Sequence, residues 1–584
     1  MSQKELVFRI GGAAGDGSAS TAESLAKVFT RSGLYVFTYT SYQSVIRGGH
    51  SWVQVRAAEE PVLSQGERPQ VLICLNQPTA DIHAPQVREN GAIIYDSDTI
   101  KLDGLRIAEG VRRIGFPLGR LAREFSNNAL MKNTVALGAA VRLYDLDLAV
   151  VESAFATVWG KKKREIVDAN VKAATAGYKY VETNGGSLNL GLRYTGKARL
   201  LITGNQAIAL GALAAGCKLL AQYPMTPASS IMHWMADHAP AHGVVVKQVE
   251  DELAAMNMAI GAGFAGVRSM TATSGGGFCL MVEAIGQGGM VEAPVVAVLA
   301  QRAGPSTGLP TKTEQGDLNL ALGAGQGDWP RAILAPRNTD ECFRLTAEAF
   351  NLAEVYQTPV IVMSDLYLSE GYRTVEGFDF NVPIIRGLLA ADGGTPREKF
   401  LRYKITESGV SPRALPGQPG FQFAAGTDEH DEKGELISDV LAGIPEYVEI
   451  RKQMMDKRMR KLDGLRRDTK GPELWGPEKA DLTLISWGST QGPLREAILD
   501  LQESDGLAVN SLEYAYIFPF HVDETKAALK RAKRTMAVEG NFTGQFSRLL
   551  TAETGIRPDH LFAKYDGEPF YPSEIAAKVR EVLG

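Results

Sequence analysis

The sequence predicts an α/β protein built from several open, mostly parallel sheets. Short apolar runs alternate with helical stretches along most of the chain, a pattern typical of strands that helices bury on both faces. The chain has 584 residues, 45% of them hydrophobic, and at roughly 150 residues per domain this length predicts about four domains. A single small binding module is therefore excluded.

The first α/β domain is expected at residues 1–185. A strand-like run at 6–10, a glycine-rich turn at 11–17 and a helical stretch at 21–29 make the first half of a βαβ unit. Further strands are predicted at 34–37, 71–75 and 92–95, and a loop at 47–51. A polar, glycine-rich join follows, and residues 186–197 are assigned to a linker.

The glycine-rich turn at 11–17 suggests two binding hypotheses, and neither is favoured. A dinucleotide site has the order G-x-G-x-x-G and an acid after the next strand, whereas residues 38–40 carry no acid. Asp16 between two glycines resembles the diphosphate motif of thiamine enzymes, but no Asn follows before residue 75 to complete a Mg²⁺ site. A tight structural turn is the better interpretation.

The rest of the chain divides into three parts. A second α/β domain is predicted at 198–370, beginning with a strand at 198–204. Residues 371–475 should form an extended connection and a charged helix, whose basic run at 457–461 is interpreted as a solvated face. A C-terminal α/β domain is expected at 476–584.

Composition excludes several classes of function. There are 62 Lys and Arg residues against 67 Asp and Glu, which argues against nucleic-acid and membrane partners. A basic-then-apolar leader and an 18-residue apolar run are both absent, so a cytoplasmic location is expected. The four cysteines are far apart in the sequence, which argues against a disulfide framework, a zinc site or an iron–sulfur cluster held by this chain alone.

Two candidate site residues of the second domain lie at predicted helix starts. Thr226 lies between two prolines before a predicted helix, where a carboxylate or phosphate is favoured, although a plain capped helix entry is the alternative. Glu252 follows two acids that we interpret as helix caps, and it leads a helix of small and apolar residues. Because such a helix should be buried, Glu252 is expected to face the interior and to act as a proton donor.

The other candidates follow predicted strands. Thr273, Ser274 and Gly275 form a small-residue loop that lets a flat ring or a diphosphate approach the backbone. Arg302 lies at the carboxyl end of an apolar strand, where open α/β sheets bind ligands, and its guanidinium suits a bidentate contact with a carboxylate. A structural arginine is the alternative, but the grouping of these residues in one domain predicts a ligand site.

The motifs around these residues resemble the α subunit of 2-oxoacid:ferredoxin oxidoreductases. They read YPMTP at 223–227, EDELAA at 250–255, TATSGGGF at 271–278, QRAGPSTGLPTKTEQGD at 301–317, GTDEHDEKG at 426–434 and EGNFTGQ at 539–545. Residues 1–185, with RGGHS at 47–51, resemble the γ domain of this family fused ahead of α. The turn at 11–17 departs from the γ pattern G-x-G-G-Q-G, so no ligand role is transferred to it.

The resemblance implies a γ-like domain, a thiamine-diphosphate pyrimidine-binding domain and a transketolase C-terminal-like domain. It also implies that a 2-oxoacid, coenzyme A and oxidised ferredoxin give acyl-CoA, CO₂ and reduced ferredoxin. Glu252 would hydrogen-bond N1′ of the cofactor pyrimidine, with the loop 273–275 beside it. Thr226 and Arg302 would hold the substrate. Thr311 and Lys312 would reach a distal carboxylate, which favours 2-oxoglutarate over pyruvate.

The resemblance further implies a separate β subunit that holds the Mg²⁺-diphosphate and a [4Fe-4S] cluster in an (αβ)₂ heterotetramer. Electrons would pass to ferredoxin, with a place in the TCA cycle, and the chain alone is expected to be inactive. The alternatives are a thiamine-dependent decarboxylase or transketolase-like enzyme without iron–sulfur electron transfer, and a non-enzymatic nucleotide-binding or electron-transfer accessory protein.

Overall fold

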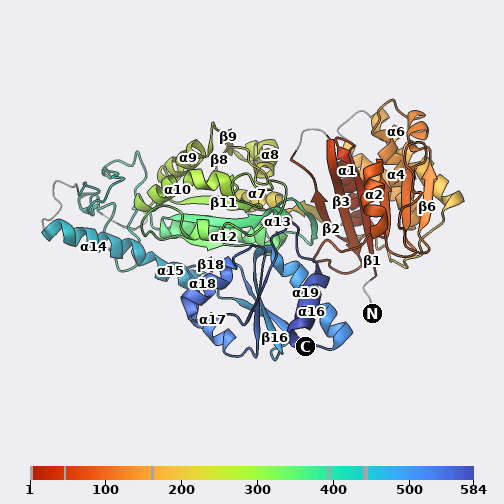
Figure 1. Cartoon of the computed structure of the whole chain (residues 1–584). Coiled ribbons are helices and arrows are strands. Elements are labelled where there is room, and N and C mark those ends of the chain that lie inside the picture. The colour runs from red at the N-terminus through yellow and green to blue at the C-terminus, as the bar shows by residue number, and fades with distance from the viewer. Residues whose placement is uncertain (1–3, 45–47, 160–163, 391–392, 395, 438–444) are drawn as a thin grey trace. The chain divides into compact units, whose positions relative to one another are not determined.

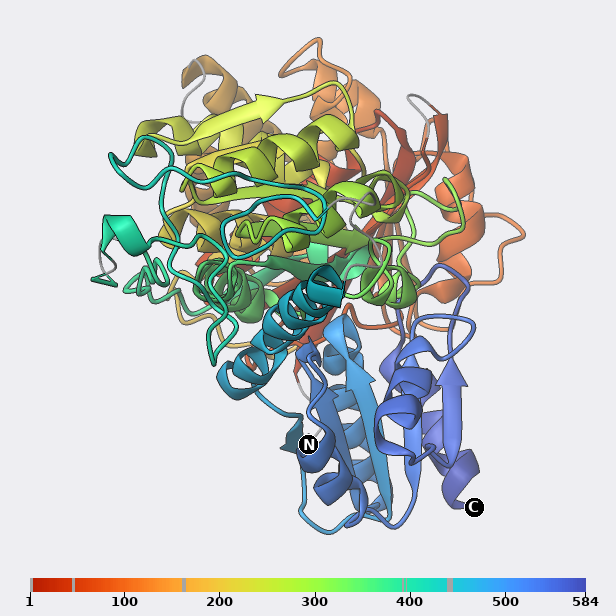
Figure 2. The same ribbon diagram turned by 90° about the vertical axis from the view of Figure 1, so that its left-hand side faces the viewer.

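The computed structural model describes residues 4–44, 48–159, 164–390, 393–394, 396–437 and 445–584, as drawn in Figure 1 and turned by 90° in Figure 2. These residues form three open sheets, which confirms the predicted fold class. They belong to two compact units, one of residues 1–203 with 370–377 and one of residues 204–369 with 378–584. In the described helices, no segment combines the length and apolar character needed to cross a membrane.

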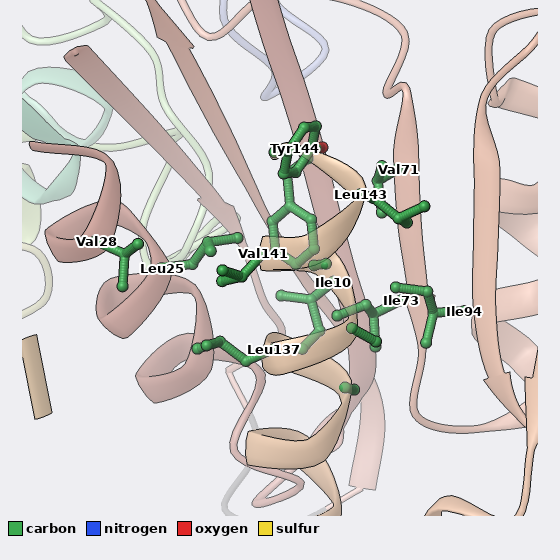
Figure 3. Close-up of a cluster of buried hydrophobic side chains, with 14 of the residues drawn as sticks. Ile10, Leu25, Val28, Val71, Ile73, Ile94, Leu137, Val141, Leu143 and Tyr144 are labelled. Atoms are coloured by element: carbon green, nitrogen blue, oxygen red, sulfur yellow. The ribbon is translucent and has the colours of Figure 1, made fainter. Parts of the chain in front are cut away.

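The first unit contains a mixed sheet with the strand order β6-β5-β4-β1-β3-β2-β14-β7. Its strands are β1 (Glu5–Ala14), β2 (Tyr35–Ser41), β3 (Gly48–Ala58), β4 (Val71–Cys74), β5 (Ala92–Asp96), β6 (Arg112–Phe116), β7 (Leu200–Thr203) and β14 (Tyr372–Val375). Its helices are α1 (Ser18–Arg31), α2 (Gln77–His83), α3 (Leu118–Arg123), α4 (Met131–Leu143), α5 (Leu148–Trp159) and α6 (Arg164–Asn184). Figure 3 shows the core where Leu25 of α1 and Leu137 of α4 meet Ile10 and Ile73 of the sheet.

The structure corrects two predictions in this sheet. The loop predicted at 47–51 is wrong from residue 48 onward, because β3 lies antiparallel between β1 and β2; Arg47 is outside the described residues. The strand predicted to begin the second domain also belongs here, since β7 pairs with β14. An isolated apolar run predicts a strand but carries no information about which sheet it joins. The turn predicted at 11–17 is shorter than expected, because residues 11–14 belong to β1; in the tight turn that follows, the Asp16 carboxylate accepts a hydrogen bond from the Ala13 amide at 2.8 Å.

The second unit holds a sheet with the order β18-β12-β13-β11-β10-β8-β9, parallel except for β18. Its strands are β8 (Leu219–Gln222), β9 (Val245–Gln248), β10 (Ser269–Thr273), β11 (Val295–Gln301), β12 (Ala332–Leu334), β13 (Pro359–Asp365) and β18 (Tyr516–Phe518). Its helices are α7 (Gly204–Ala214), α8 (Ser229–His238), α9 (Glu252–Phe264), α10 (Gly275–Met290), α11 (Leu318–Leu322), α12 (Thr339–Tyr356) and α13 (Leu366–Glu370). Helices α9 and α10 cover one face, and α7 and α12 cover the other (Figure 1).

The same unit contains the C-terminal sheet, with the order β15-β17-β16-β19-β20. Its strands are β15 (Glu473–Trp475), β16 (Leu482–Trp487), β17 (Val509–Tyr514), β19 (Thr535–Glu539) and β20 (His560–Ala563). Helices α16 (Gln491–Asp505) and α19 (Pro572–Leu583) pack on one face, and α17 (Val522–Leu529) and α18 (Gln545–Thr554) on the other. Apart from the edge strand β15, its strands pair in parallel.

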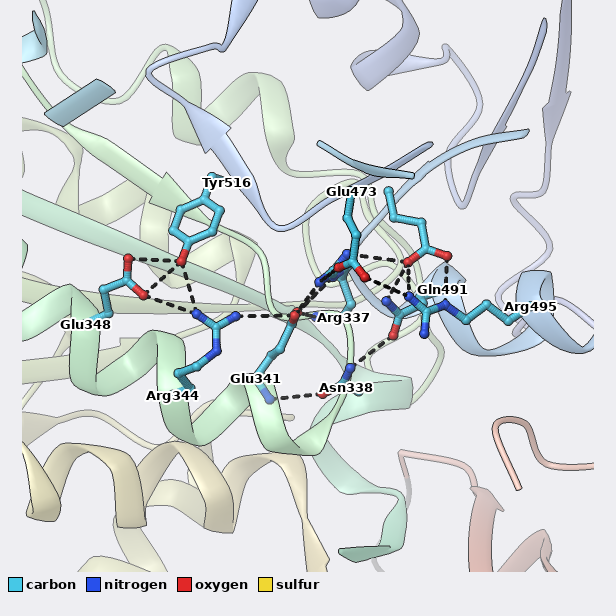
Figure 4. Close-up of polar contacts among 10 residues, drawn as sticks. Arg337, Asn338, Glu341, Arg344, Glu348, Glu473, Gln491, Arg495 and Tyr516 are labelled. Carbon is cyan, nitrogen blue, oxygen red and sulfur yellow. Dashed lines mark hydrogen bonds and ion pairs between the residues drawn. The ribbon is translucent and has the colours of Figure 1, made fainter. Parts of the chain in front are cut away.

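A polar network joins α12 to the C-terminal sheet (Figure 4). Arg337, which precedes α12, binds Glu341 of the helix at 2.5 Å and the Glu473 carboxylate of β15 at 2.7 Å, and Arg344 of α12 donates to the Tyr516 hydroxyl at 3.1 Å. Strand β18, which carries Tyr516, adds to the edge of the second sheet at β12. The two sheets of this unit are therefore linked through both backbone and charged side chains.

Three of the four basic residues in the run at 457–461, namely Lys457, Arg458 and Lys461, are buried, which contradicts its interpretation as a solvated face. The run spans the end of α14 (Pro445–Met459) and the start of α15 (Lys461–Asp468). Lys457 and Lys461 are both 0% exposed, and both ammonium groups bind the Glu292 carboxylate. A charge run has the same sequence pattern whether it meets solvent or a distant buried acid, which explains the error.

Candidate active site

The predicted site residues gather at one edge of the second sheet. Strands β9, β8, β10 and β11 are adjacent and parallel, so their carboxyl ends lie together. Thr226 follows β8, Glu252 follows β9, Ser274 follows β10 and Arg302 follows β11. The structure thus brings these residues to the edge where open α/β sheets bind ligands.

Glu252 is a buried carboxylate at the first position of α9. The preceding Asp251 caps the helix by accepting a hydrogen bond from the Ala254 amide at 2.7 Å, as predicted. Glu252 is 3% exposed, and within the described part of the chain its Oε1 has no hydrogen-bond partner. Burial of a polar atom without a partner is costly, so Glu252 Oε1 is the atom that a ligand would be expected to meet.

Glycines at the start of α10 allow two carboxylates to approach the backbone. A Cβ on Gly277 would lie 2.1 Å from Thr273 Oγ1 and 2.5 Å from Glu252 Oε1. A Cβ on Gly275 would lie 2.6 Å from an oxygen of Asp317. The first turn of α10 is therefore flanked by Glu252 and Asp317, and any larger residue at these two positions would displace a site residue.

The remaining predicted residues also contact this edge. The Arg302 Nη1 atom donates to the backbone oxygen of Thr226 at 2.8 Å. Thr273 Oγ1 lies 3.7 Å from Met225 Sδ, and Ser274 is the buried residue before α10. Arg302 thus bridges the loops that follow β8 and β11.

Thr311 and Lys312 lie further along the loop that follows β11. Thr311 is buried, and the Lys312 ammonium forms an ion pair with Glu568 of the C-terminal domain. A role for these residues toward a substrate carboxylate remains a prediction.

Two acids of the site, Glu314 and Asp317, were missed as candidates. Burial raises the pKa of Asp317 to about 6, although the nearby Arg302 opposes the shift. Burial, together with the charge of Asp317, raises the pKa of Glu314 to about 7. Their position in the loop after Arg302 could have identified them from the sequence, because that loop must start at the ligand-binding edge of the sheet. Acids with raised pKa values in such a position are typical of functional sites.

The fold and this edge define an α/β enzyme subunit that presents a buried carboxylate and an arginine to a ligand. A thiamine-diphosphate-binding family model of pyruvate flavodoxin/ferredoxin oxidoreductase matches residues 210–448, and a second model, of pyruvate ferredoxin/flavodoxin oxidoreductase, matches residues 7–180. The α subunit of 2-oxoacid:ferredoxin oxidoreductase 2 from Aeropyrum pernix is 31% identical over 99% of this chain and 98% of its own.

Two further relatives match along nearly their whole lengths. The 2-oxoglutarate oxidoreductase subunit KorA of Mycobacterium tuberculosis is 31% identical over 99% of this chain and 92% of its own. The solved 2-oxoglutarate:ferredoxin oxidoreductase of Magnetococcus marinus, with 2-oxoglutarate, coenzyme A and succinyl-CoA bound, is 33% identical with a TM-score of 0.91 and full coverage of both chains. The chain belongs to the 2-oxoacid:ferredoxin oxidoreductase family, as an α subunit with a γ-like N-terminal domain.

Proposed function

We propose that this γ–α fused subunit acts with a separate β subunit to convert 2-oxoglutarate, coenzyme A and oxidised ferredoxin into succinyl-CoA, CO₂ and reduced ferredoxin. The observation that carries the proposal is the buried Glu252 carboxylate, whose Oε1 faces a glycine-rich helix start. The relatives that support 2-oxoglutarate as substrate are about one-third identical to the chain. Pyruvate and other 2-oxoacids are therefore included in the test.

The site residues fit the pyrimidine half of thiamine diphosphate. Glu252 offers an unpartnered carboxylate oxygen for a ring nitrogen, and the loop 273–275 offers small residues against which a flat ring can pack. When bound, this cofactor supplies the carbon nucleophile that attacks the 2-oxo group. Glu252 would hold the proton at N1′, while Thr226 and Arg302 would orient the substrate carboxylate and its 2-oxo oxygen.

Other parts of the reaction are assigned to partners. We place the Mg²⁺-diphosphate and a [4Fe-4S] cluster in the β subunit, within an (αβ)₂ assembly in the cytoplasm that transfers electrons to ferredoxin and serves the TCA cycle.

The Lys312 ammonium would bind the distal carboxylate of 2-oxoglutarate by exchanging its Glu568 partner for the substrate.

Viologen reduction with a panel of 2-oxoacids tests the proposal on the chain co-purified with its β subunit. The complex should be active and brown, and the isolated chain inactive. Turnover by the chain alone would contradict the proposal. A colourless β subunit in a complex that consumes 2-oxoacids without reducing viologen would also contradict it, and would favour a decarboxylase without electron transfer.

Glu252→Gln tests the assigned acid. Turnover should fall by a factor of roughly 10²–10⁴, the usual contribution of a positioned acid, while assembly with the β subunit persists. Glu250 is exposed, so Glu250→Gln is the matched control and should retain activity. Near-normal turnover by Glu252→Gln would show that another acid holds N1′.

A further inference from the structure

The C-terminal domain contributes no predicted substrate or cofactor residue, yet its carboxyl edge holds the loop that carries Glu314 and Asp317. We call residues 313–319 the acid loop. It precedes and enters α11, and it faces the residues that follow β16 and β19 of the C-terminal sheet. The same edge carries the EGNFTGQ motif at 539–545, to which the proposed function assigns no role.

Gln315 is the first anchor of the acid loop. Its backbone amide donates to the Gly540 oxygen at 2.6 Å, and its Nε2 donates to the Trp487 oxygen at 2.9 Å. Its Oε1 accepts from Thr490 at 3.0 Å and from the Gly540 amide at 2.9 Å. Gln315 is 3% exposed, so this side chain is both buried and hydrogen-bonded through donor and acceptor.

Asn541 and Gln545 form the second anchor. Asn541 Nδ2 donates to the backbone oxygen of Gln315 at 3.2 Å and to the Glu539 carboxylate at 3.0 Å. Gln545 Nε2 donates to the Gly316 oxygen at 2.7 Å, and its Oε1 accepts from the Asn319 amide at 2.9 Å. The second of these bonds satisfies a backbone donor in the first turn of α11.

Asp317 lies between these fixed points. Its backbone amide donates to Gln301 Oε1 at 3.0 Å, and its carboxylate packs against Gly275. We propose that Asn541 and Gln545 are positioning residues of the active site, which hold the Asp317 carboxylate against the first turn of α10 and beside Arg302. This inference rests on the proposed role of Arg302 in binding the substrate carboxylate.

The pH dependence of activity should report the position of the acid loop. Among the described residues, the ionisable groups that interact with Asp317 are Arg302 from the end of β11, Glu314 from the loop itself and Cys279 from α10. Burial raises the pKa of Asp317 to about 6 from an ordinary 3.8. A loosened loop admits water, so the pKa of Asp317 should fall. The acid limb of the activity profile, which should follow the ionisation of Asp317, should then move to lower pH.

Asn541→Ala and Gln545→Ala test the proposal against Asn510→Ala. Asn510 is a buried asparagine at the start of β17, whose Nδ2 donates to the Pro477 oxygen at 2.8 Å. The first measurement is amide hydrogen exchange of residues 313–319 in the α chain alone. Exchange should be roughly tenfold faster in Asn541→Ala, which loses one hydrogen bond to the loop, and at least as fast in Gln545→Ala, which loses two; it should be unchanged in Asn510→Ala.

The second measurement is the pH profile of kcat/KM in the complex with the β subunit. The test variants should lose on the order of 10- to 100-fold in kcat/KM and show the shifted acid limb. Gln545→Glu keeps the acceptor for Asn319 but places a carboxylate oxygen against the Gly316 oxygen, so it should be at least as impaired as Gln545→Ala. The proposal would be overturned if Asn541→Ala and Gln545→Ala matched Asn510→Ala both in amide hydrogen exchange of the acid loop and in the pH profile of kcat/KM. An inactive wild-type complex would refute the proposed function instead, and the exchange measurement would then decide whether Asn541 and Gln545 hold the acid loop.

Discussion

Gly277→Ala is expected to impair catalysis while leaving the fold intact. The added Cβ would lie 2.1 Å from Thr273 Oγ1 and 2.5 Å from Glu252 Oε1. Both oxygens must retreat by roughly 0.5 to 1 Å to reach an acceptable contact. A third contact, 2.7 Å from Glu252 Cγ, lies within the side chain, and Thr273 is buried and β-branched. Both side chains must therefore shift, and a part of the stability is lost as well.

The catalytic cost should be much larger than the cost in stability. A displacement of about 1 Å in a catalytic group is enough to slow a reaction on the order of 10²-fold. We therefore expect kcat/KM to fall by a factor of roughly 10 to 100, which corresponds to about 1.4–2.7 kcal/mol of transition-state stabilisation. Glu252 accounts for most of this loss, since it is the group assigned to the cofactor.

Gly276→Ala is the matched control, because a Cβ at that position meets no atom within 4 Å. Both variants should be compared in complex with the β subunit by viologen reduction and by thermal unfolding. A small difference in melting temperature with a 10-fold or greater difference in kcat/KM is the expected result. Activity of Gly277→Ala within twofold of Gly276→Ala would refute the view that this glycine sets the position of Glu252.

Three further predictions concern charged residues. Arg302→Lys should lower kcat/KM for the 2-oxoacid by roughly 10- to 100-fold, mainly by raising KM, because an ammonium lacks the planar fork of a guanidinium; steady-state kinetics check this. Lys312→Met should raise KM for 2-oxoglutarate about tenfold more than KM for pyruvate, whereas equal effects would indicate that its ion pair with Glu568 is only structural. Glu292→Gln should lower the free energy of unfolding by about 3–5 kcal/mol, since it leaves two buried lysines without their carboxylate. Burial alone would raise the pKa of Glu292, but the lysines outweigh it and hold the pKa well below 4.5. The contribution of Glu292 to stability is therefore fully present above pH 4.5 and is lost in acid. Denaturant titration at several pH values should show that acid lowers the free energy of unfolding less in the variant than in the wild type.

The location of Thr226, Glu252 and Arg302 could be predicted because it follows from local sequence order. Arg302 directly follows the buried strand β11 and so must lie at the carboxyl edge of its sheet, whereas Thr226 and Glu252 were located by the helix starts at 229 and 252. The glycine-rich start of α10 was readable for a similar reason, since small residues indicate close backbone approach. These features require no knowledge of distant contacts.

Features that depend on distant partners could not be predicted. Lys457 and Glu292 are 165 positions apart, so the sequence shows a basic run but not the acid that neutralises it. Gln315 and Asn541 are 226 positions apart, and their contact assigns a role to a motif that had none. The pairing of β7 with β14 likewise depends on a strand that the chain supplies much later.

Strand β14 makes the first sheet dependent on a segment from the second half of the chain. It lies between β2 and β7, so a truncation after residue 203 would remove the strand that joins them. The edge of β2 would then present unpaired backbone groups, which favour aggregation. We therefore expect an excised N-terminal unit to be more stable when residues 370–377 are grafted back, for example through a short loop after β7.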